Sequence, residues 1–319
     1  MINRQWLLAK RPVGAVTPDC FRYNEVPSQA SPPADGMVLL RHELLLCAPT
    51  IRNWISGNRD SYYPTVEIDA PIMAPAIGRI VVSNDPDWPV GTRLVGAGSW
   101  QDEQWVDPVK QGFRKVPEHI SSVDAMGVVG INALTAYCGL LRVGQVREGE
   151  VLLVSGAAGS VGSVVAQIGR IKGCRVIGIC GGADKVRWLS EECGIDHVID
   201  YKGEDVVARL DELCPDGIDV FFDNVGGSLL RDVVARMKPK GRIVLCGQIS
   251  AYEGTGEVAT PPLDVMRMIY GGIRMEGFLA RHHVAAFDEA INDLAQWDAE
   301  GLLTHREDVR DGFARLPET

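Results

Sequence analysis

The sequence predicts an α/β protein with two domains, a barrel-like β domain followed by a doubly wound parallel sheet. Up to about residue 120 the chain is a series of short apolar runs divided by Gly, Pro, Asp and Asn. After Glu118 strands and helices alternate instead, with six strand candidates. The length of 319 residues also accommodates two domains, because a domain usually has roughly 100 to 200 residues.

The first domain is predicted from three apolar runs of strand length, "GMVLLRHELLLCAP", "IGRIVVSN" and "VGTRLVGAG". Turn-forming residues separate them, which is typical of antiparallel strands joined by short loops. This rhythm favours an all-β domain with a barrel-like arrangement.

The second domain opens with helical apolar spacing over residues 122–144. Six strand candidates follow, at 151–156, 175–182, 197–201, 218–227, 241–248 and 273–280. Helical patterns lie between the early ones, at 160–173, 183–194, 203–214 and 227–239. Such alternation implies parallel strands joined by right-handed crossovers, and six strands complete a doubly wound fold.

A final amphipathic helix is predicted over about 283–300, and the short tail after it is expected to pack back onto the β domain. We therefore assign residues 1–121 and 290–319 to the β domain and 122–289 to the parallel-sheet domain.

The stretch "VLLVSGAAGSVGSVVAQIGRIKG" carries the main functional signal. Gly156 ends a strand where the chain must turn sharply, Gly159 leaves room for a pyrophosphate, and Gly162 lets the following helix pack closely on the sheet. The helix N-terminus, from Ser160 onward, offers N–H groups and a positive dipole end to phosphates. Glycines at strand ends are often turns and nothing more, but here the triplet opens a strand–helix alternation. The context favours a dinucleotide site.

An acidic residue that would hold the ribose of NAD is missing after the second strand, which ends "GICGGADKVRW". Gly181 and Gly182 leave space there, and Lys185 and Arg187 follow. Two basic side chains at this point favour a ribose 2′-phosphate, and hence NADP(H) over NAD. The alternative is that both are solvated residues, with Asp184 as a helix cap.

Charge and composition exclude several classes of partner. The net charge of −10 and the pI near 5.1 disfavour nucleic acid and anionic membranes. There is no uninterrupted 18-residue apolar stretch, so we predict no membrane segment and a cytoplasmic location. None of the eight cysteines forms a CxxC pair, and His282 and His283 have no partner nearby in sequence, so no metal site is predicted.

Several stretches together resemble the zinc-free medium-chain dehydrogenase/reductases, in the branch of the prostaglandin reductases, plant double-bond reductases and curcumin reductases. The stretches are "LTAYCGLL", "VSGAAGSVGSVVAQIGRIKGCRVIGI", "GGADKV", "IDYK", "CPDGIDVFFDNVGG", "GRIVLCGQISAY" and "RMEGF", with weaker support from "DSYYPTVEI". The resemblance covers nearly the whole chain and implies a GroES-like β domain, a Rossmann dinucleotide-binding domain, and an active site in the cleft between them.

The resemblance also implies NADPH as cofactor, no zinc, and a homodimer that pairs through the last strand of the Rossmann sheet, near "IRMEGF". Besides Gly156 it assigns cofactor contacts as follows: Gly159, Ser160, Val161 and Gly162 at the pyrophosphate; Lys185 and Tyr201 at the 2′-phosphate; Asn224, Cys246, Gly247 and Ile249 along the cofactor; Phe278, Leu279 and Ala280 near the nicotinamide.

The reaction implied is reduction of a carbon–carbon double bond conjugated to a carbonyl, on a small-molecule substrate. Tyr252 is the family's candidate donor to the carbonyl oxygen, where negative charge develops. A loop tyrosine that only packs by its ring is the alternative interpretation. Two other functions stay open: a quinone reductase or secondary-alcohol dehydrogenase of the same family, and an NADPH-binding protein without catalysis.

Departures from the family pattern concentrate where the substrate is expected. Glu253 follows Tyr252, Thr50 replaces a tyrosine in "APTIRNW", a glycine-rich stretch becomes "PIMAPA" at 71–76, and a proline-rich loop is reduced to Pro261 and Pro262. These changes predict a different substrate pocket. The resemblance further implies a closing helix and strand beyond residue 319.

Overall fold

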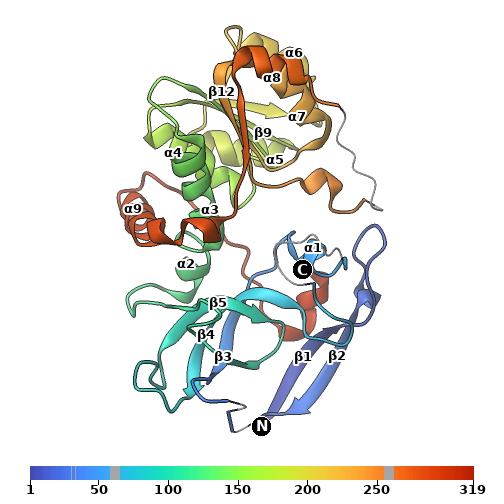
Figure 1. The fold of residues 1–319 in the computed structure, drawn as a ribbon, viewed down its shortest axis with the longest axis vertical. Coiled ribbons are helices and arrows are strands. Elements are labelled where there is room, and N and C mark those ends of the chain that lie inside the picture. The colour runs from blue at the N-terminus through green and yellow to red at the C-terminus, as the bar shows by residue number, and fades with distance from the viewer. Residues whose placement is uncertain (30, 33, 58–64, 255–261) are drawn as a thin grey trace. The chain divides into compact units, whose positions relative to one another are not determined.

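A computed structural model describes residues 1–29, 31–32, 34–57, 65–254 and 262–319. Residues 60–64 of "DSYYPTVEI" and Pro261 lie outside the described residues. The chain forms two compact units, which are coloured along the chain in Figure 1. The first comprises Met1–Met126 and Glu307–Thr319, and the second comprises Gly127–Arg306.

The first unit is built on antiparallel strands. The strands are β1 (Ile2–Leu8), β2 (Phe21–Pro27), β3 (Val38–Leu45), β4 (Met73–Val82), β5 (Arg93–Ser99), β6 (Glu103–Val106) and β7 (Arg114–Lys115). β1 and β2 form a hairpin, and the others form one sheet in the order β6-β3-β4-β5-β7. Isolated bridges from Gln5 to Gln101 and from Leu7 to Pro71 connect the hairpin to that sheet. Among the described residues, the predicted barrel is therefore a partly open one.

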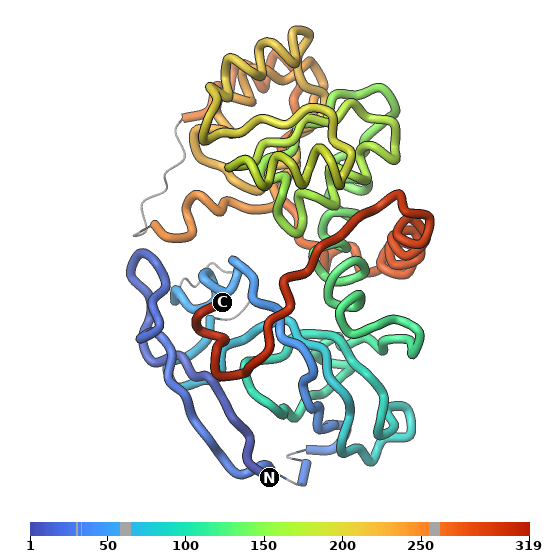
Figure 2. Tube along the Cα trace, turned by 180° about the vertical axis from the view of Figure 1, so that it is seen from behind, coloured from blue at the N-terminus to red at the C-terminus, as the bar shows by residue number. Residues whose placement is uncertain are grey.

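The C-terminal segment completes the first unit. It ends in the 3₁₀ helix η6 (Phe313–Glu318), and Figure 2 shows it lying among the N-terminal strands of this unit. The Trp6 indole Nε1 donates a 2.9 Å hydrogen bond to the carbonyl of Phe313, and the Arg4 guanidinium lies 5.0 Å from the centre of the Phe313 ring. Leu316 packs against the cluster around Leu8. The tail thus returns to the β unit, as predicted.

The second unit is the predicted doubly wound domain. Its strands are β8 (Val151–Ser155), β9 (Arg175–Cys180), β10 (His197–Asp200), β11 (Ile218–Asp223), β12 (Met237–Leu245) and β13 (Arg274–Gly277). All neighbours pair in parallel, in the order β10-β9-β8-β11-β12-β13. In order of the chain this is 3-2-1-4-5-6, the Rossmann arrangement, so the predicted fold class is confirmed.

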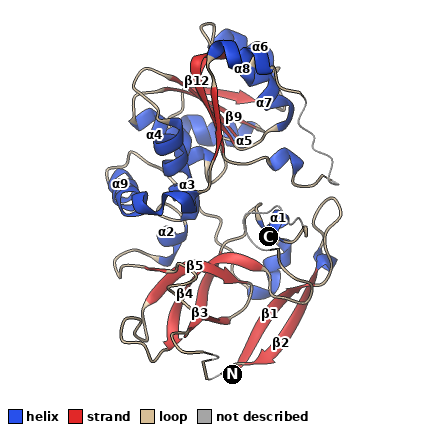
Figure 3. Ribbon diagram, viewed as in Figure 1, coloured by secondary structure: helices blue, strands red, loops and turns tan. Residues whose placement is uncertain are grey.

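Helices flank this sheet, as Figure 3 shows. The helices of the second unit are α3 (Ile131–Tyr137), α4 (Gly162–Ile171), α5 (Ala183–Arg187), α6 (Val206–Leu213), α7 (Gly227–Val234), α8 (Val265–Gly271) and α9 (Phe287–Ala299), of which α9 packs on α3 and not on the sheet. The first unit has α1 (Ile51–Trp54), α2 (Ser122–Met126) and the 3₁₀ turn η1 (Pro18–Cys20). Further short helices of π or 3₁₀ type are η2 (Cys138–Gly144), η3 (Trp188–Glu192), η4 (Ile249–Ala251) and η5 (Ala280–Ala286).

The helical spacing predicted over 122–144 corresponds to three helical segments, α2, α3 and the π-helical η2. Gly127 and Gly130 lie in the break, where glycine lowers the cost of leaving the helix. The boundary between the two units falls at this break, after Met126.

Helix α9 lies in the second unit, whose chain runs to Arg306, whereas we expected the return to begin at residue 290. Tyr137 of α3 holds the helix. Its ring stacks on Trp297 at 6.1 Å between centroids, and its hydroxyl donates to Asp293 (2.7 Å) and Glu289 (3.1 Å). Apolar periodicity predicts such a helix but does not reveal which domain its apolar face covers.

The core of the second unit lies between the sheet and its helices. Its centre consists of buried side chains of five strands, among them Leu153, Ile177, Phe221 and Ile243. The inward faces of α6 and α7 close it, with Leu210 and Val233. Within the described ranges, every helix is too short or too polar to cross a membrane.

His42 is a buried imidazole on β3 of the first unit. Its Nδ1 lies 2.7 Å from the carbonyl oxygen of Gln101, and because a carbonyl only accepts, Nδ1 carries the proton. Its Nε2 is buried and has no hydrogen-bond partner among the described residues. A second proton would leave an unpaired N–H inside the protein, and burial accordingly lowers the pKa of His42 from 6.5.

We expect acid to destabilise the fold through His42. The unfolded chain takes up the proton first, so stability falls as the pH drops below the usual histidine pKa of about 6.5, by at most about 1.4 kcal/mol per pH unit. Urea denaturation of the wild type and of His42→Asn, whose amide keeps a donor toward Gln101, measures this between pH 7.5 and 5. An equal pH dependence in both proteins would contradict the assignment.

Candidate dinucleotide-binding site

The candidate site lies at the carboxyl ends of the central strands of the second unit. β8 and β11 are neighbours there, and the chain order reverses between them. In open parallel sheets such a switch point leaves a crevice beyond the strand ends, where ligands bind. The loops after β8, β9, β11 and β12 therefore contain the residues to consider.

The loop after β8 has the geometry expected of the glycine triplet. Gly156 has φ +58°, a left-handed conformation that other residues adopt only with strain. A Cβ on Gly162 would lie 2.3 Å from the carbonyl oxygen of Gly156, inside any van der Waals contact. Helix α4 can therefore approach the end of β8 only if residue 162 is glycine.

The outer part of this loop is the part that remains open to a ligand. Gly159 and Ser160 are exposed and Val161 is half-buried, directly before the 10-residue helix α4. A Cβ on Gly159 would meet only the Gly156 carbonyl, at 3.2 Å. The first N–H groups of a helix have no acceptor within it, so this surface suits a phosphate.

A buried carboxylate that the sequence analysis did not single out connects the first and fourth strands. Asp223, at the end of β11, accepts hydrogen bonds from the Ser155 hydroxyl (2.7 Å) and from the N–H groups of Val225 (2.9 Å) and Gly226 (3.0 Å). The Ser155 hydroxyl accepts in turn from the N–H of Asn224 (2.8 Å). Burial raises the pKa of Asp223, while these donors favour its charged form and limit the shift.

Asn224 belongs to the same arrangement. Its amide Nδ2 donates a 2.7 Å hydrogen bond to the Ser155 carbonyl, so the side chain fixes the turn after β8 relative to β11. The predicted contact of Asn224 with a cofactor would therefore have to come from groups of this residue that do not bond to Ser155. A polar residue ending each of two apolar strands was the signal in the sequence that could have revealed Ser155 and Asp223.

The loop after β12 lies along the end of β11. Cys246 and Gly247 donate to the Asp223 carbonyl, at 2.8 and 3.2 Å, and Ile249 donates to the carbonyl of Asn224 at 3.2 Å. Burial raises the pKa of the Cys246 thiol to about 12, which leaves it protonated. A Cβ on Gly247 would lie 3.3 Å from the Tyr252 hydroxyl, so Tyr252 turns back over the strand end.

The loop after β9 explains why an acid is missing. The Tyr201 ring lies over Gly181, where a Cβ would be 2.6 Å from the ring atom Cε1. An aspartate at 181 would collide with this ring. Tyr201 is 57% exposed, so its outer face and hydroxyl are available to a ligand.

The two basic residues of α5 differ in the structure. Arg187 forms an ion pair with Asp184, which neutralises its charge. Lys185 is exposed, and no ion pair to it occurs within the described part of the chain. Lys185 is therefore the cation that suits a 2′-phosphate, because the Asp184 carboxylate is paired with Arg187 and not with Lys185.

The predicted contacts at 278–280 are only partly available. The Phe278 ring packs against Phe222 at 6.2 Å and His283 at 6.3 Å, and it fills the space beside Gly139. Ala280 is buried as well. Leu279, which is half-buried, and the main chain of this segment are the groups left to meet a nicotinamide.

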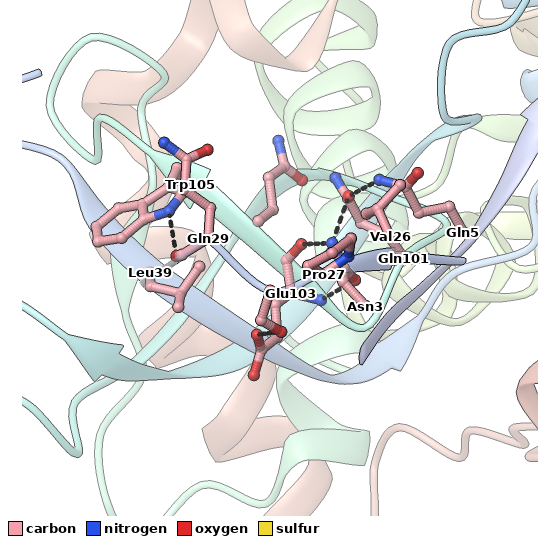
Figure 4. A pocket seen from close by; sticks show the side chains of 11 residues that line it. Asn3, Gln5, Val26, Pro27, Gln29, Leu39, Gln101, Glu103 and Trp105 are labelled. Carbon is pink, nitrogen blue, oxygen red and sulfur yellow. Dashed lines mark hydrogen bonds between the residues drawn. The ribbon is translucent and has the colours of Figure 1, made fainter. Parts of the chain in front are cut away.

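A separate pocket of about 310 Å³ opens in the β unit, between the β1–β2 hairpin and β6. Figure 4 shows that polar side chains line it, and they bond to one another. Asn3 donates to Gln101 at 3.2 Å, and Ser28 donates to Glu103 at 2.7 Å. Because these groups already have partners, we do not assign the dinucleotide to this pocket. In the described ranges, no group of three or more His, Cys, Asp or Glu side chains is arranged to hold a metal ion.

Comparison with known proteins shows which family has these features. A family model described as the N-terminal domain of oxidoreductase matches residues 4–116, and one described as zinc-binding dehydrogenase matches 160–296. The chain is 37% identical to an NADPH-dependent curcumin reductase of Escherichia coli, over 99% of this chain and 92% of that protein. It is 35% identical to prostaglandin reductase 1 of Oryctolagus cuniculus, over 98% and 88%.

The crystal structure of CurA from Vibrio vulnificus superposes with a TM-score of 0.90 at 36% identity, covering 99% of this chain and 93% of that one. A structure of CurA in complex with NADPH matches equally well, with 94% of its chain covered. The chain belongs to the medium-chain dehydrogenase/reductase family. Within that family it belongs to the zinc-free branch that contains the curcumin and prostaglandin reductases.

The difference between the two basic residues of α5 gives a test. Lys185→Ala is expected to weaken NADPH binding about tenfold or more and to change NADH binding little, because NADH lacks the 2′-phosphate. Arg187→Ala, which removes a cation already paired with Asp184, is the matched control. Fluorescence titration of the wild type and both variants gives the six dissociation constants, and equal weakening of both cofactors by Lys185→Ala would contradict the assignment.

Proposed function

We propose that this chain is an NADPH-dependent reductase of the carbon–carbon double bond in α,β-unsaturated ketones and aldehydes. The observation that supports it most is the 37% identity to the E. coli curcumin reductase along nearly the whole chain. A 2-alkenal reductase of Nicotiana tabacum, 31% identical over 90% of this chain and 83% of its own, shares this chemistry.

The residues present fit the cofactor. Gly159 and Ser160 offer an open main-chain surface at the start of α4 for the pyrophosphate, and we assign the 2′-phosphate to Lys185 and Tyr201, which follow β9 and β10. When bound, NADPH supplies the hydride that reduces the β-carbon. The frame formed by Ser155 and Asp223 keeps the surrounding loops fixed, which favours a reactive geometry.

The protein must also stabilise charge. Hydride addition to the β-carbon moves negative charge onto the carbonyl oxygen, and an O–H donor near that oxygen lowers the barrier. We assign this donor to Tyr252, which is half-buried in the loop after β12 with its hydroxyl beside Gly247. The proton then reaches the α-carbon, so the net reaction consumes one hydride and one proton.

The activity test uses substrates of different classes. We expect NADPH to be oxidised with an aryl-substituted enone and the saturated ketone to form. A para-quinone, and a secondary alcohol with NADP⁺, probe the related activities. Absorbance at 340 nm and product analysis separate the cases, and turnover of the quinone alone would overturn the proposal.

Replacing Tyr252 with Phe removes the proposed donor. We expect kcat on the enone to fall on the order of 10²-fold, or less where a cofactor hydroxyl shares the role, while the Kd for NADPH is unchanged. Tyr23→Phe, the same change on β2 of the other unit, is the control. Unaltered turnover by Tyr252→Phe would favour the interpretation that Tyr252 only packs by its ring.

We also propose that the chain forms a homodimer through β13. This strand ends the sheet, so one of its sides has unpaired main-chain groups within the described structure. The preceding helix α8 exposes apolar side chains, with Ile269 at 62% and Tyr270 at 81%. An edge strand beside an apolar face suits a two-fold pairing of identical surfaces. The cytoplasmic location inferred from the sequence stays a prediction.

A charge on this apolar face is expected to disrupt the dimer. Ile269→Asp would bring two like charges together across a two-fold interface and yield a monomer in light-scattering chromatography. Val109→Asp changes a residue of similar exposure (74%) in the other unit and is expected to leave the mass unaltered. A monomeric wild type, or a dimeric Ile269→Asp, would contradict the interface.

A further inference from the structure

Asp200 ends strand β10 with a carboxylate that connects two separate loops. Its Oδ1 accepts a 2.8 Å hydrogen bond from the N–H of Gly182 and a 3.0 Å hydrogen bond from the N–H of Lys202. The first donor lies in the turn between β9 and α5, and the second lies in the loop after β10. These two donors lower the pKa of Asp200, so the carboxylate is charged at neutral pH.

The hydrogen bond to Gly182 fixes the start of α5. Gly182 has φ +98° and is the N-cap of this helix. Its carbonyl accepts hydrogen bonds from the N–H groups of Lys185 (3.0 Å) and Val186 (3.2 Å). The position of the Lys185 main chain therefore depends on a residue whose own N–H is held by Asp200.

The hydrogen bond to Lys202 fixes the other loop. Tyr201 lies between Asp200 and Lys202, and its N–H donates to the carbonyl of Cys180 at 3.0 Å. The same residue covers Gly181 with its ring. One carboxylate oxygen thus holds both the helix start that carries Lys185 and the loop that carries Tyr201.

We propose that Asp200 is a positioning residue for recognition of the 2′-phosphate of NADPH, a role that rests on the function proposed above. In NAD-binding domains of this fold an acid that follows the second strand hydrogen-bonds the ribose hydroxyls. Here that place is glycine, and the acid ends the neighbouring strand with Oδ1 directed at two main-chain amides. The Oδ1 acceptor of Asp200 thereby holds the phosphate-binding groups in place.

A simpler role would be electrostatic repulsion, in which the Asp200 carboxylate weakens binding of a nearby phosphate. The two roles predict different results for two conservative variants. Asp200→Asn keeps an oxygen acceptor at the same place and removes the charge, whereas Asp200→Glu keeps the charge and displaces the acceptor by one methylene. Positioning predicts that the glutamate variant is impaired, and repulsion predicts that the asparagine variant is improved.

The experiment measures the Kd of NADPH and of NADH by fluorescence titration of the full chain and its variants. Because the loss of two hydrogen bonds is worth roughly tenfold in binding, we expect Asp200→Ala and Asp200→Glu to raise the Kd for NADPH about tenfold. For NADH we expect less than about threefold, and for Asp200→Asn we expect both constants within about threefold of wild type. Asp196→Ala removes an exposed charge four residues earlier, and we expect it to alter neither.

Rescue by asparagine together with loss by glutamate supports positioning. Tighter NADPH binding by Asp200→Asn, or equal weakening of both cofactors by Asp200→Glu, would overturn it, and neither result depends on whether the alanine variant folds. A wild type without preference for NADPH would count against the proposed function itself and would remove the basis of this role. A wild type that prefers NADPH, with variants that fail as described, would count against Asp200 alone.

Discussion

The site depends on the contact between helix α4 and the end of strand β8. The Gly162 Cα lies so close to the Gly156 carbonyl that any side chain would collide with it. This contact places the start of the helix directly beyond the sheet, where its first N–H groups face the crevice of the switch point. If a methyl group at residue 162 pushed helix α4 away from the strand, the N–H groups at the start of the helix would no longer lie where they could bind a pyrophosphate.

Polar residues at the strand ends extend this frame sideways. Ser155, Asp223 and Asp200 end the strands β8, β11 and β10, and the side chain of each accepts a hydrogen bond from a main-chain N–H of a loop at this end of the sheet. Because most partners are main-chain N–H groups, the carboxylates fix loop conformation instead of pairing with cations. A ligand therefore meets loops that are already ordered, which reduces the entropy that binding costs.

The sequence predicted the parts of the structure that depend on periodicity and spacing. All six parallel strands were found, because apolar runs of strand length alternate with helical patterns. The glycine triplet also predicted the turn between β8 and α4, because the close packing there requires residues without a side chain. The interruption between α2 and α3 and the domain assignment of α9 were not predicted, because both depend on which apolar faces meet.

The roles of Asp200 and Asp223 were missed for a related reason. Each acts through main-chain amides of loops, and an amide carries no residue identity that a sequence pattern could reveal. Phe278, by contrast, was expected at the nicotinamide, yet its ring fills the space beside Gly139. A sequence pattern can indicate that a residue has a role, but only the folded structure shows which groups its side chain contacts.

The structure of a crystal of this protein soaked in NADPH tests most directly whether the crevice binds the cofactor. We expect density for the pyrophosphate against the main chain of Gly159 to Gly162, and for the adenosine phosphate between Lys185 and Tyr201. An empty crevice at saturating NADPH, or a nucleotide bound in the pocket of the β unit, would contradict it.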